Sequence, residues 1–157
     1  MRLYELRREE KMREARTWVI RSFHPQSVED FLATMKTDEY TYVRMVTSYW
    51  DMAASFVVHG AIDPEMFRAV SGEMLAVYCK VEHMIDELRE VQKPFPYRHI
   101  EQVVADWPGA EQVMGRFREY FKSLAEQGTE IDYRSDLESA SCCGVRICLD
   151  VSSVRIH

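Results

Sequence analysis

Residues 49–67 read YWDMAASFVVHGAIDPEMF, and this stretch contains the signals for a helical hairpin. Gly60 stands where a helix would end in the left-handed conformation. Asp63 and Pro64 then supply an N-cap followed by proline at the first helical position. We therefore expect residues 60–63 to join two antiparallel helices.

The apolar spacing on either side of this turn predicts two long helices. From about residue 38 to 59, apolar side chains cover more than half of the circumference, which favours a central place in the core. From 63 to about 91, apolar residues recur every three or four positions, which predicts one continuous helix. Its core face holds Phe67, Val70, Met74, Val77, Val81, Met84 and Leu88, and its opposite, polar face holds Glu73, Lys80, His83, Glu87 and Glu90.

The turn also pairs residues across the two helices. Reflection of the chain about position 61 places Trp50 opposite Gly72. Because a glycine inside a helix lowers its stability, we expect Gly72 to make room for a bulky neighbour, with the indole packed on its backbone.

Further helices are predicted outward from this hairpin. One runs from about residue 3 to 23 and is broken by His24 and Pro25. A short helix follows, opened by Ser27 with Asp30 three residues later. Beyond Pro94 and Pro96, helices are expected near 97–107 and from 110 to 128. The predicted fold class is all-α, a compact bundle of five to six helices in a domain spanning residues 1–128.

Residues 129–157 have a different composition and are expected to form a poorly structured tail. Val145 to Val151 alternate in polarity, but a lone strand needs a sheet to join. The tail holds three of the four cysteines and ends in His157. Their spacing differs from the usual zinc patterns, so a reduced, structureless tail is preferred over a zinc site or a redox role.

Composition limits the classes of function. The chain has 157 residues, 46% of them hydrophobic, and a net charge of −6, which disfavours nucleic-acid binding. No apolar run is long enough for a membrane span, and the start does not resemble a signal peptide. The cysteine pattern fits a reducing compartment, so we expect a cytoplasmic protein.

The first predicted helix is rich in charges of both signs. Six basic residues alternate with acidic ones, namely Arg7, Arg8, Lys11, Arg13, Arg16 and Arg21. A solvated face is the simplest interpretation of this pattern. A docking surface for an acidic protein partner is the alternative.

Motifs that define common enzyme classes, such as the P-loop, G-x-S-x-G and H-E-x-x-H, are absent from the sequence. We therefore assign no catalytic residue, cofactor or metal ligand. His83 has Asp86 and Glu87 at suitable helical spacing, but a metal ion would need a third ligand such as His59 or His99. An exposed salt-bridge face explains that group better.

One polar stripe on the helix at 38–59 could carry chemistry. It consists of Arg44, Ser48, Asp51, Ser55 and His59. The stripe is the solvated side of the helix, a buried structural network, or the lining of a ligand pocket. In the last case Arg44 would hold an anionic group, and Asp51 or His59 would transfer a proton.

The strings YELRREEKMREARTWVI, YWDMAASFVVHGAIDPEMF and HIEQVV give the chain a family resemblance. Over about residues 3–126 it resembles a group of uncharacterised bacterial proteins, of acidobacterial type, that form all-helical domains of unknown function. The most specific piece runs from Tyr49 through Gly60 to Phe67. The resemblance implies a fold and carries no function.

Two functions remain open at this stage. The first is a non-catalytic helical interaction module that self-associates, as a homodimer, because the chain has more long apolar side chains than one bundle covers easily. The second is a small-molecule-binding protein or enzyme with a polar pocket beside the helix at 38–59, the third along the chain.

Overall fold

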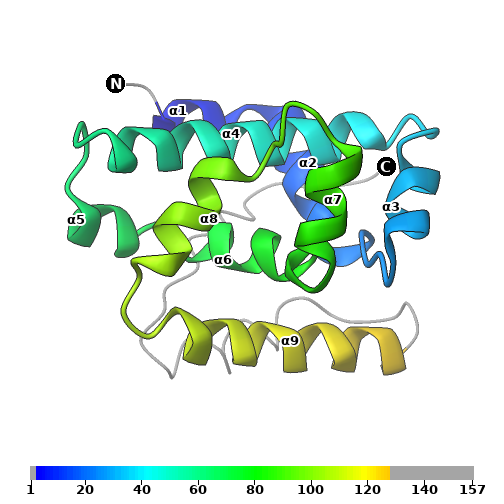
Figure 1. Cartoon of the computed structure of the whole chain (residues 1–157). Helices are drawn as coiled ribbons and strands as arrows, with labels where there is room; N and C mark the ends of the chain where they lie inside the picture. The colour runs from blue at the N-terminus through cyan, green and yellow to red at the C-terminus, as the bar shows by residue number, and fades with distance from the viewer. Residues whose placement is uncertain (1–2, 128–157) are drawn as a thin grey trace, which may run out of the picture.

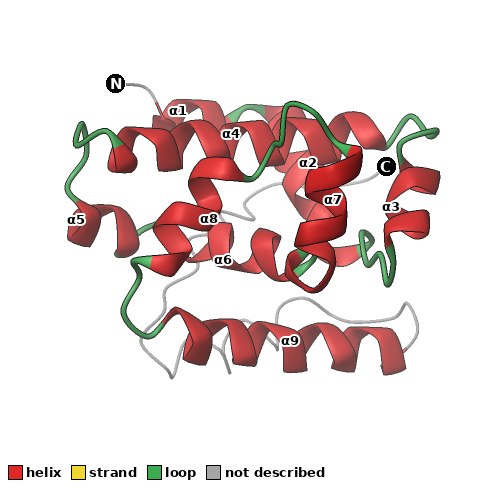
Figure 2. Cartoon of the chain, viewed as in Figure 1, coloured by secondary structure: helices red, strands yellow, loops and turns green. Residues whose placement is uncertain are grey.

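A computed structural model describes residues 3–127, and the regular structure in this range is entirely helical (Figures 1 and 2). Nine α-helices and one 3-10 helix lie within it. The predicted all-α fold class is confirmed. The expected tail at 129–157, with Cys142, Cys143, Cys148 and His157, lies outside the described residues.

The predicted first helix is divided into α1 (Leu3–Arg8) and α2 (Glu10–Arg21). Glu9 has an extended backbone, with φ −58° and ψ 137°. In one continuous helix, Arg7 and Arg16 would project from opposite sides about 13.5 Å apart along the axis. The break turns α1 so that both guanidinium groups reach Glu73.

The capping signals are confirmed in detail. The Ser27 side chain accepts a hydrogen bond from the Asp30 amide at the start of α3 (Val28–Thr34). The Asp30 carboxylate in turn accepts from the Gln26 amide at 3.0 Å, one residue before the N-cap. After α4 (Tyr40–Val58), Gly60 has φ 72°, and Asp63 caps α5 (Pro64–Arg68) by accepting from the Met66 amide at 2.9 Å.

The prediction of one continuous helix from 63 to 91 is wrong. The segment forms α5, α6 (Gly72–Cys79), the 3-10 helix η1 (Glu82–Met84) and α7 (Ile85–Val91). At the first break the Ser71 hydroxyl donates to the Phe67 carbonyl at 2.6 Å. Val70, which the periodicity placed in the core, lies in the turn at this break and is 67% exposed.

The most buried helix is α6 rather than α4. The side chains from Glu73 to Cys79 are all buried, because α6 packs against α2, α8 and α9. By contrast, α4 packs mainly against α2 and α8 and keeps one face in solvent. Figure 1 shows α5 and α6 below α4, running back toward its beginning, with α9 below α6. The helix at 38–59 was expected in the centre, and α4 packs along its buried face against α2 and α8, while the shorter α6 is more completely enclosed.

The last two helices agree with the prediction. These are α8 (Arg98–Ala105) and α9 (Ala110–Gln127), and Gly109 between them has φ 78°. In the described part of the chain, no helix has the length and apolar character that crossing a membrane requires.

Candidate functional site

The polar stripe predicted on α4 is divided between solvent and a bonded network. Arg44, Ser48 and His59 are exposed, whereas Asp51 is half-buried. The solvated interpretation therefore holds for most of the stripe, and the structural network holds at Asp51. Arg44 lies two helical turns before Asp51, and its exposed side chain does not join the network described below.

Asp51 anchors the start of α8. Its Oδ1 atom accepts hydrogen bonds from the backbone amides of His99, at 2.8 Å, and Ile100, at 3.2 Å. Tyr97, the N-cap residue of α8, makes no side-chain cap of its own. A carboxylate from α4 therefore supplies the missing cap, and its negative charge is favourable beside the N-terminus of α8.

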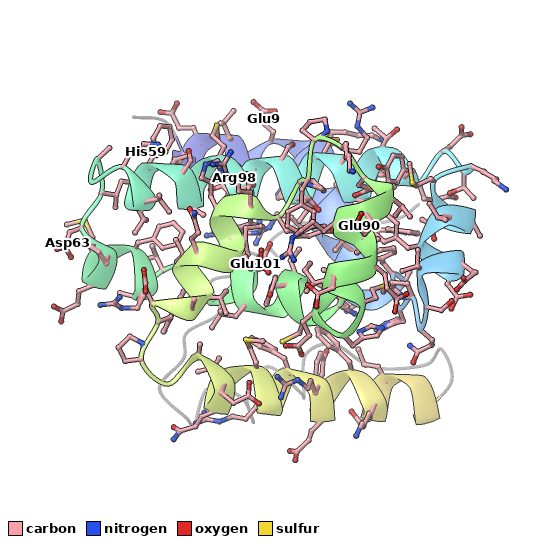
Figure 3. The ribbon with its side chains drawn as sticks, in the orientation of Figure 1. Glu9, His59, Asp63, Glu90, Arg98 and Glu101 are labelled. Atoms are coloured by element: carbon pink, nitrogen blue, oxygen red, sulfur yellow. The ribbon has the colours of Figure 1, made fainter. Side chains whose placement is uncertain are left out.

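The second carboxylate oxygen of Asp51 fixes a histidine ring. His99 Nδ1 lies 2.8 Å from Asp51 Oδ2, and the His59 ring lies near the His99 ring with 5.9 Å between centroids. Figure 3 shows His59, at the end of α4, on the same side of the molecule as Arg98, at the start of α8. We call Asp51, His99 and His59 the Asp51–His99–His59 cluster.

The cluster contains two of the three predicted pocket residues. The sequence pattern does not link His99 to Asp51, and His99 was named there only as a third ligand beside His83. The two residues are 48 positions apart, and only the packing of α8 on α4 brings them together. A carboxylate-oriented imidazole can transfer protons or act as a ligand, because its other nitrogen is held in one orientation.

A second polar cluster lies inside the protein. Arg16 Nε donates to Glu73 Oε1 at 2.7 Å, and Arg16 Nη2 bonds to Oε2 of the same carboxylate. Arg7 Nη2 donates to Glu73 Oε2 at 3.3 Å. Glu73 was predicted on an exposed face but is only 4% exposed. Two cations on one buried carboxylate tie α1 and α2 to α6.

Trp50 and Tyr49 form one side of this buried cluster. The Arg7 guanidinium lies over the Trp50 ring, 5.1 Å from its centroid, and the rings of Tyr49 and Trp50 meet edge to face. Burial raises the pKa of Tyr49. Trp50 is buried as predicted, at 2% exposed, but its contact with Gly72 remains a prediction.

Lys80 is the third notable buried group, and it was also predicted on an exposed face. Its Nζ atom donates to the Ile20 carbonyl at 2.8 Å, lies 3.0 Å from His24 Nδ1, and sits 3.5 Å from the centroid of the Phe121 ring. Burial lowers the pKa of Lys80 to about 6. Burial and the neighbouring Lys80 also lower the pKa of His24.

Within residues 3–127, no group of three or more His, Cys, Asp or Glu side chains is placed to hold a metal ion. His83, Asp86 and Glu87 are exposed, and Asp86 accepts from Arg89 at 2.7 Å. Cys79 is buried, and burial raises the pKa of its thiol to about 12. The predicted salt-bridge face is therefore present at Asp86.

These features define an all-helical domain with buried ion pairs and one carboxylate–histidine cluster near its surface. The sequence matches the DUF4760 family, described as a domain of unknown function, over residues 1–107, and the chain belongs to that family. The predicted membership of a family of unknown function is thereby confirmed, while the bacterial, acidobacterial-type origin remains a prediction. Comparisons with curated proteins and with solved structures give no match.

Proposed function

We propose that this protein is a non-catalytic helical interaction module that forms a homodimer through α5 and the turn after it. The observation that carries the proposal is the exposure of two large apolar side chains, Met66 at 69% and Val70 at 67%. Met66 lies on α5 and Val70 lies in the turn that follows it, so both belong to one short exposed stretch of the chain. Exposed apolar groups gathered in this way are typical of an interface.

The surroundings of this pair favour a second copy of the same chain. In a two-fold contact, each residue meets its counterpart's neighbours reciprocally. Glu65 and Arg68 flank Met66 on the short helix, so an antiparallel pair of α5 helices sets each glutamate opposite the other arginine. We define the α5 patch as Met66 and Val70.

The basic residues of α1 and α2 support an acidic partner less well. Arg7 and Arg16 are turned inward against Glu73, and Lys11 pairs with Glu14 at 2.9 Å. An acidic protein would therefore meet only part of the predicted basic surface. The cytoplasmic location belongs to this proposal and rests on composition alone.

Multi-angle light scattering at micromolar concentration tests the dimer. We expect a mass twice the 18.5 kDa of the chain. Met66→Lys with Val70→Lys should give the monomer mass, because two desolvated charges would face each other across the two-fold axis. Val91→Lys is the matched control, since Val91 is also exposed but lies at the end of α7.

Charge reversal tests the orientation of the two copies. Glu65→Arg alone should weaken the dimer, because it sets two arginines against each other. Glu65→Arg with Arg68→Glu restores opposite charges and should recover it. A monomeric parent protein would refute the proposal, and so would a dimer that both lysine substitutions leave intact.

The second candidate function is proton transfer or ligand binding at the Asp51–His99–His59 cluster. The observation that favours it is the 2.8 Å distance between Asp51 Oδ2 and His99 Nδ1. This contact orients the imidazole in the same way as a carboxylate orients a catalytic or metal-binding histidine. Arg44 has no part in this version. Native mass spectrometry of the purified protein separates the two functions, because a bound small molecule would add mass to the monomer.

A further inference from the structure

His59 and His99 form a pair of imidazoles that the proposed interaction surface does not use. His59 is the C-cap residue of α4, and His99 lies in the first turn of α8. Their ring centroids are 5.9 Å apart, with an angle of 56° between the planes. His59 is exposed and the His99 side chain is 24% exposed, so solvent reaches the pair.

The hydrogen bonds of both rings determine where their protons lie. His59 Nδ1 is 2.7 Å from the Ser55 carbonyl oxygen, and His99 Nδ1 is 2.8 Å from Asp51 Oδ2. A carbonyl and an ionised carboxylate only accept hydrogen bonds, so each Nδ1 must donate. In the neutral rings, the lone pair therefore lies on Nε2 of both histidines.

This arrangement is the one that surrounds metal-binding histidines. A ligating imidazole typically donates its other N–H to a carboxylate or a backbone carbonyl, which fixes the tautomer and the ring orientation. Here one ring has a carboxylate partner and the other has a carbonyl partner. Asp51 is itself held by the His99 and Ile100 amides, so the support of His99 is rigid.

The spacing of the rings is close to that of two imidazoles on one ion. With metal–nitrogen bonds of about 2.0–2.1 Å, the two centroids lie roughly 4.5–5.5 Å apart at bond angles of about 90–120°. The observed 5.9 Å is slightly longer, so a small rotation of the exposed His59 ring is needed to bring both Nε2 atoms onto one ion. Imidazole nitrogen suits Zn²⁺, Cu²⁺ and Ni²⁺ rather than Mg²⁺ or Ca²⁺, which prefer oxygen.

We propose that the chain binds a divalent transition-metal ion through Nε2 of His59 and Nε2 of His99. Asp51 is a positioning residue that orients His99. Two protein nitrogens are fewer than the three or four ligands of a resident zinc ion, so the ion is held weakly and water fills the remaining coordination positions. Its affinity is therefore lower than that of a closed four-ligand zinc site.

Titration of the metal-free full chain with Cu²⁺ and Zn²⁺ tests this site. The cysteines at 142, 143 and 148 are competing ligands, so the measurements use the chain carrying Cys142→Ser, Cys143→Ser and Cys148→Ser. We expect isothermal titration calorimetry to give one ion per chain. Electron paramagnetic resonance of the Cu²⁺ form should show coupling to nitrogen ligands.

Single variants identify the ligands. His59→Ala and His99→Ala should each lower the affinity at least tenfold, and the double variant should abolish the nitrogen coupling. His83→Ala is the matched control, because His83 is an exposed histidine on η1 and should leave binding unchanged. Asp51→Asn should lower the affinity by about 10- to 100-fold, as loss of such a supporting carboxylate does elsewhere.

Two results would overturn the proposal. One is a parent chain that binds neither ion, and the other is a double variant that binds with unchanged affinity and spectrum. Circular dichroism of each variant checks that its helices are intact. His59→Ala is the safest variant in this respect, because its ring is exposed and lies outside the hydrophobic core. The metal result is independent of the dimer, since Met66→Lys with Val70→Lys should still bind the ion.

Discussion

The buried amine of Lys80 gives the protein a pH dependence at the scale of a single residue. Burial lowers the pKa of Lys80 from 10.5 to about 6, so the folded chain holds this group neutral where the unfolded chain holds it charged. Between these two values the unfolded state binds more protons, and stability therefore rises with pH. Below about pH 6 both states are protonated and this contribution levels off.

Replacement of Lys80 by methionine removes that dependence. We expect the free energy of unfolding of Lys80→Met to vary less with pH between about 6 and 10, where the parent gains up to about 1.4 kcal/mol per pH unit. Urea denaturation at several pH values measures the difference. His24, 3.0 Å from Lys80 Nζ, contributes in the same sense, because burial and the neighbouring Lys80 lower its pKa and the folded state therefore loses stability on acidification.

If the parent and Lys80→Met show parallel pH profiles, the amine is charged in the folded state. The Phe121 ring, 3.5 Å from Nζ, and the Ile20 carbonyl would then offset its burial.

At the scale of the element, Asp63 determines where α5 begins. Its side chain accepts from the Met66 amide at 2.9 Å, which satisfies one of the free N–H groups of the first turn. We expect Asp63→Ala to lower the free energy of unfolding by about 1 kcal/mol. Asp63→Asn keeps an acceptor at the same place and should cost much less. Equal losses in the two variants, measured by urea denaturation, would contradict the capping role.

The ends of the helices could be predicted from the sequence, whereas the breaks within them could not. Ser27, Gly60 and Asp63 act on their own neighbours, so their spacing alone predicted the helix ends. The helix breaks at Glu9 and between α6 and η1 allow contacts between residues that are far apart in the sequence. They bring Arg7 to Glu73, 66 residues away, and place Lys80 beside Ile20, 60 residues away.

Periodicity failed at these breaks for a physical reason. A helical pattern records how apolar residues are spaced, but it does not report which charged group finds a buried partner. Glu73 and Lys80 were assigned to the solvated face because they are charged, yet each is 4% exposed. The candidate site shows the same limit, since Asp51 and His59 were named from their spacing on one helix and His99 entered only through the fold.

At the scale of the whole molecule, the family match and the folded structure have different ends. The DUF4760 match stops at residue 107, whereas the described helices continue through α9 to residue 127. α9 is packed against α6 rather than attached loosely. Cys79 Sγ lies 3.7 Å from the Met114 carbonyl, and Arg118 Nη2 donates to Glu82 at 3.1 Å.

Two truncations test whether the folded unit spans residues 1–128, as we propose. Removal of residues 129–157 should leave the helical circular dichroism and the melting temperature nearly unchanged, because the described contacts of α9 with α6 and η1 come from residues before position 129. Removal of residues 108–157 keeps the whole family match but deletes the buried Ala110 and Met114 and uncovers one side of α6. It should cost at least about 3 kcal/mol of stability, since burial of one methionine contributes about 1.5–3 kcal/mol and several α9 side chains are lost together. A chain of 1–107 as stable as the parent would show that α9 is accessory, and unfolding of the 1–128 chain would place the boundary of the core beyond it.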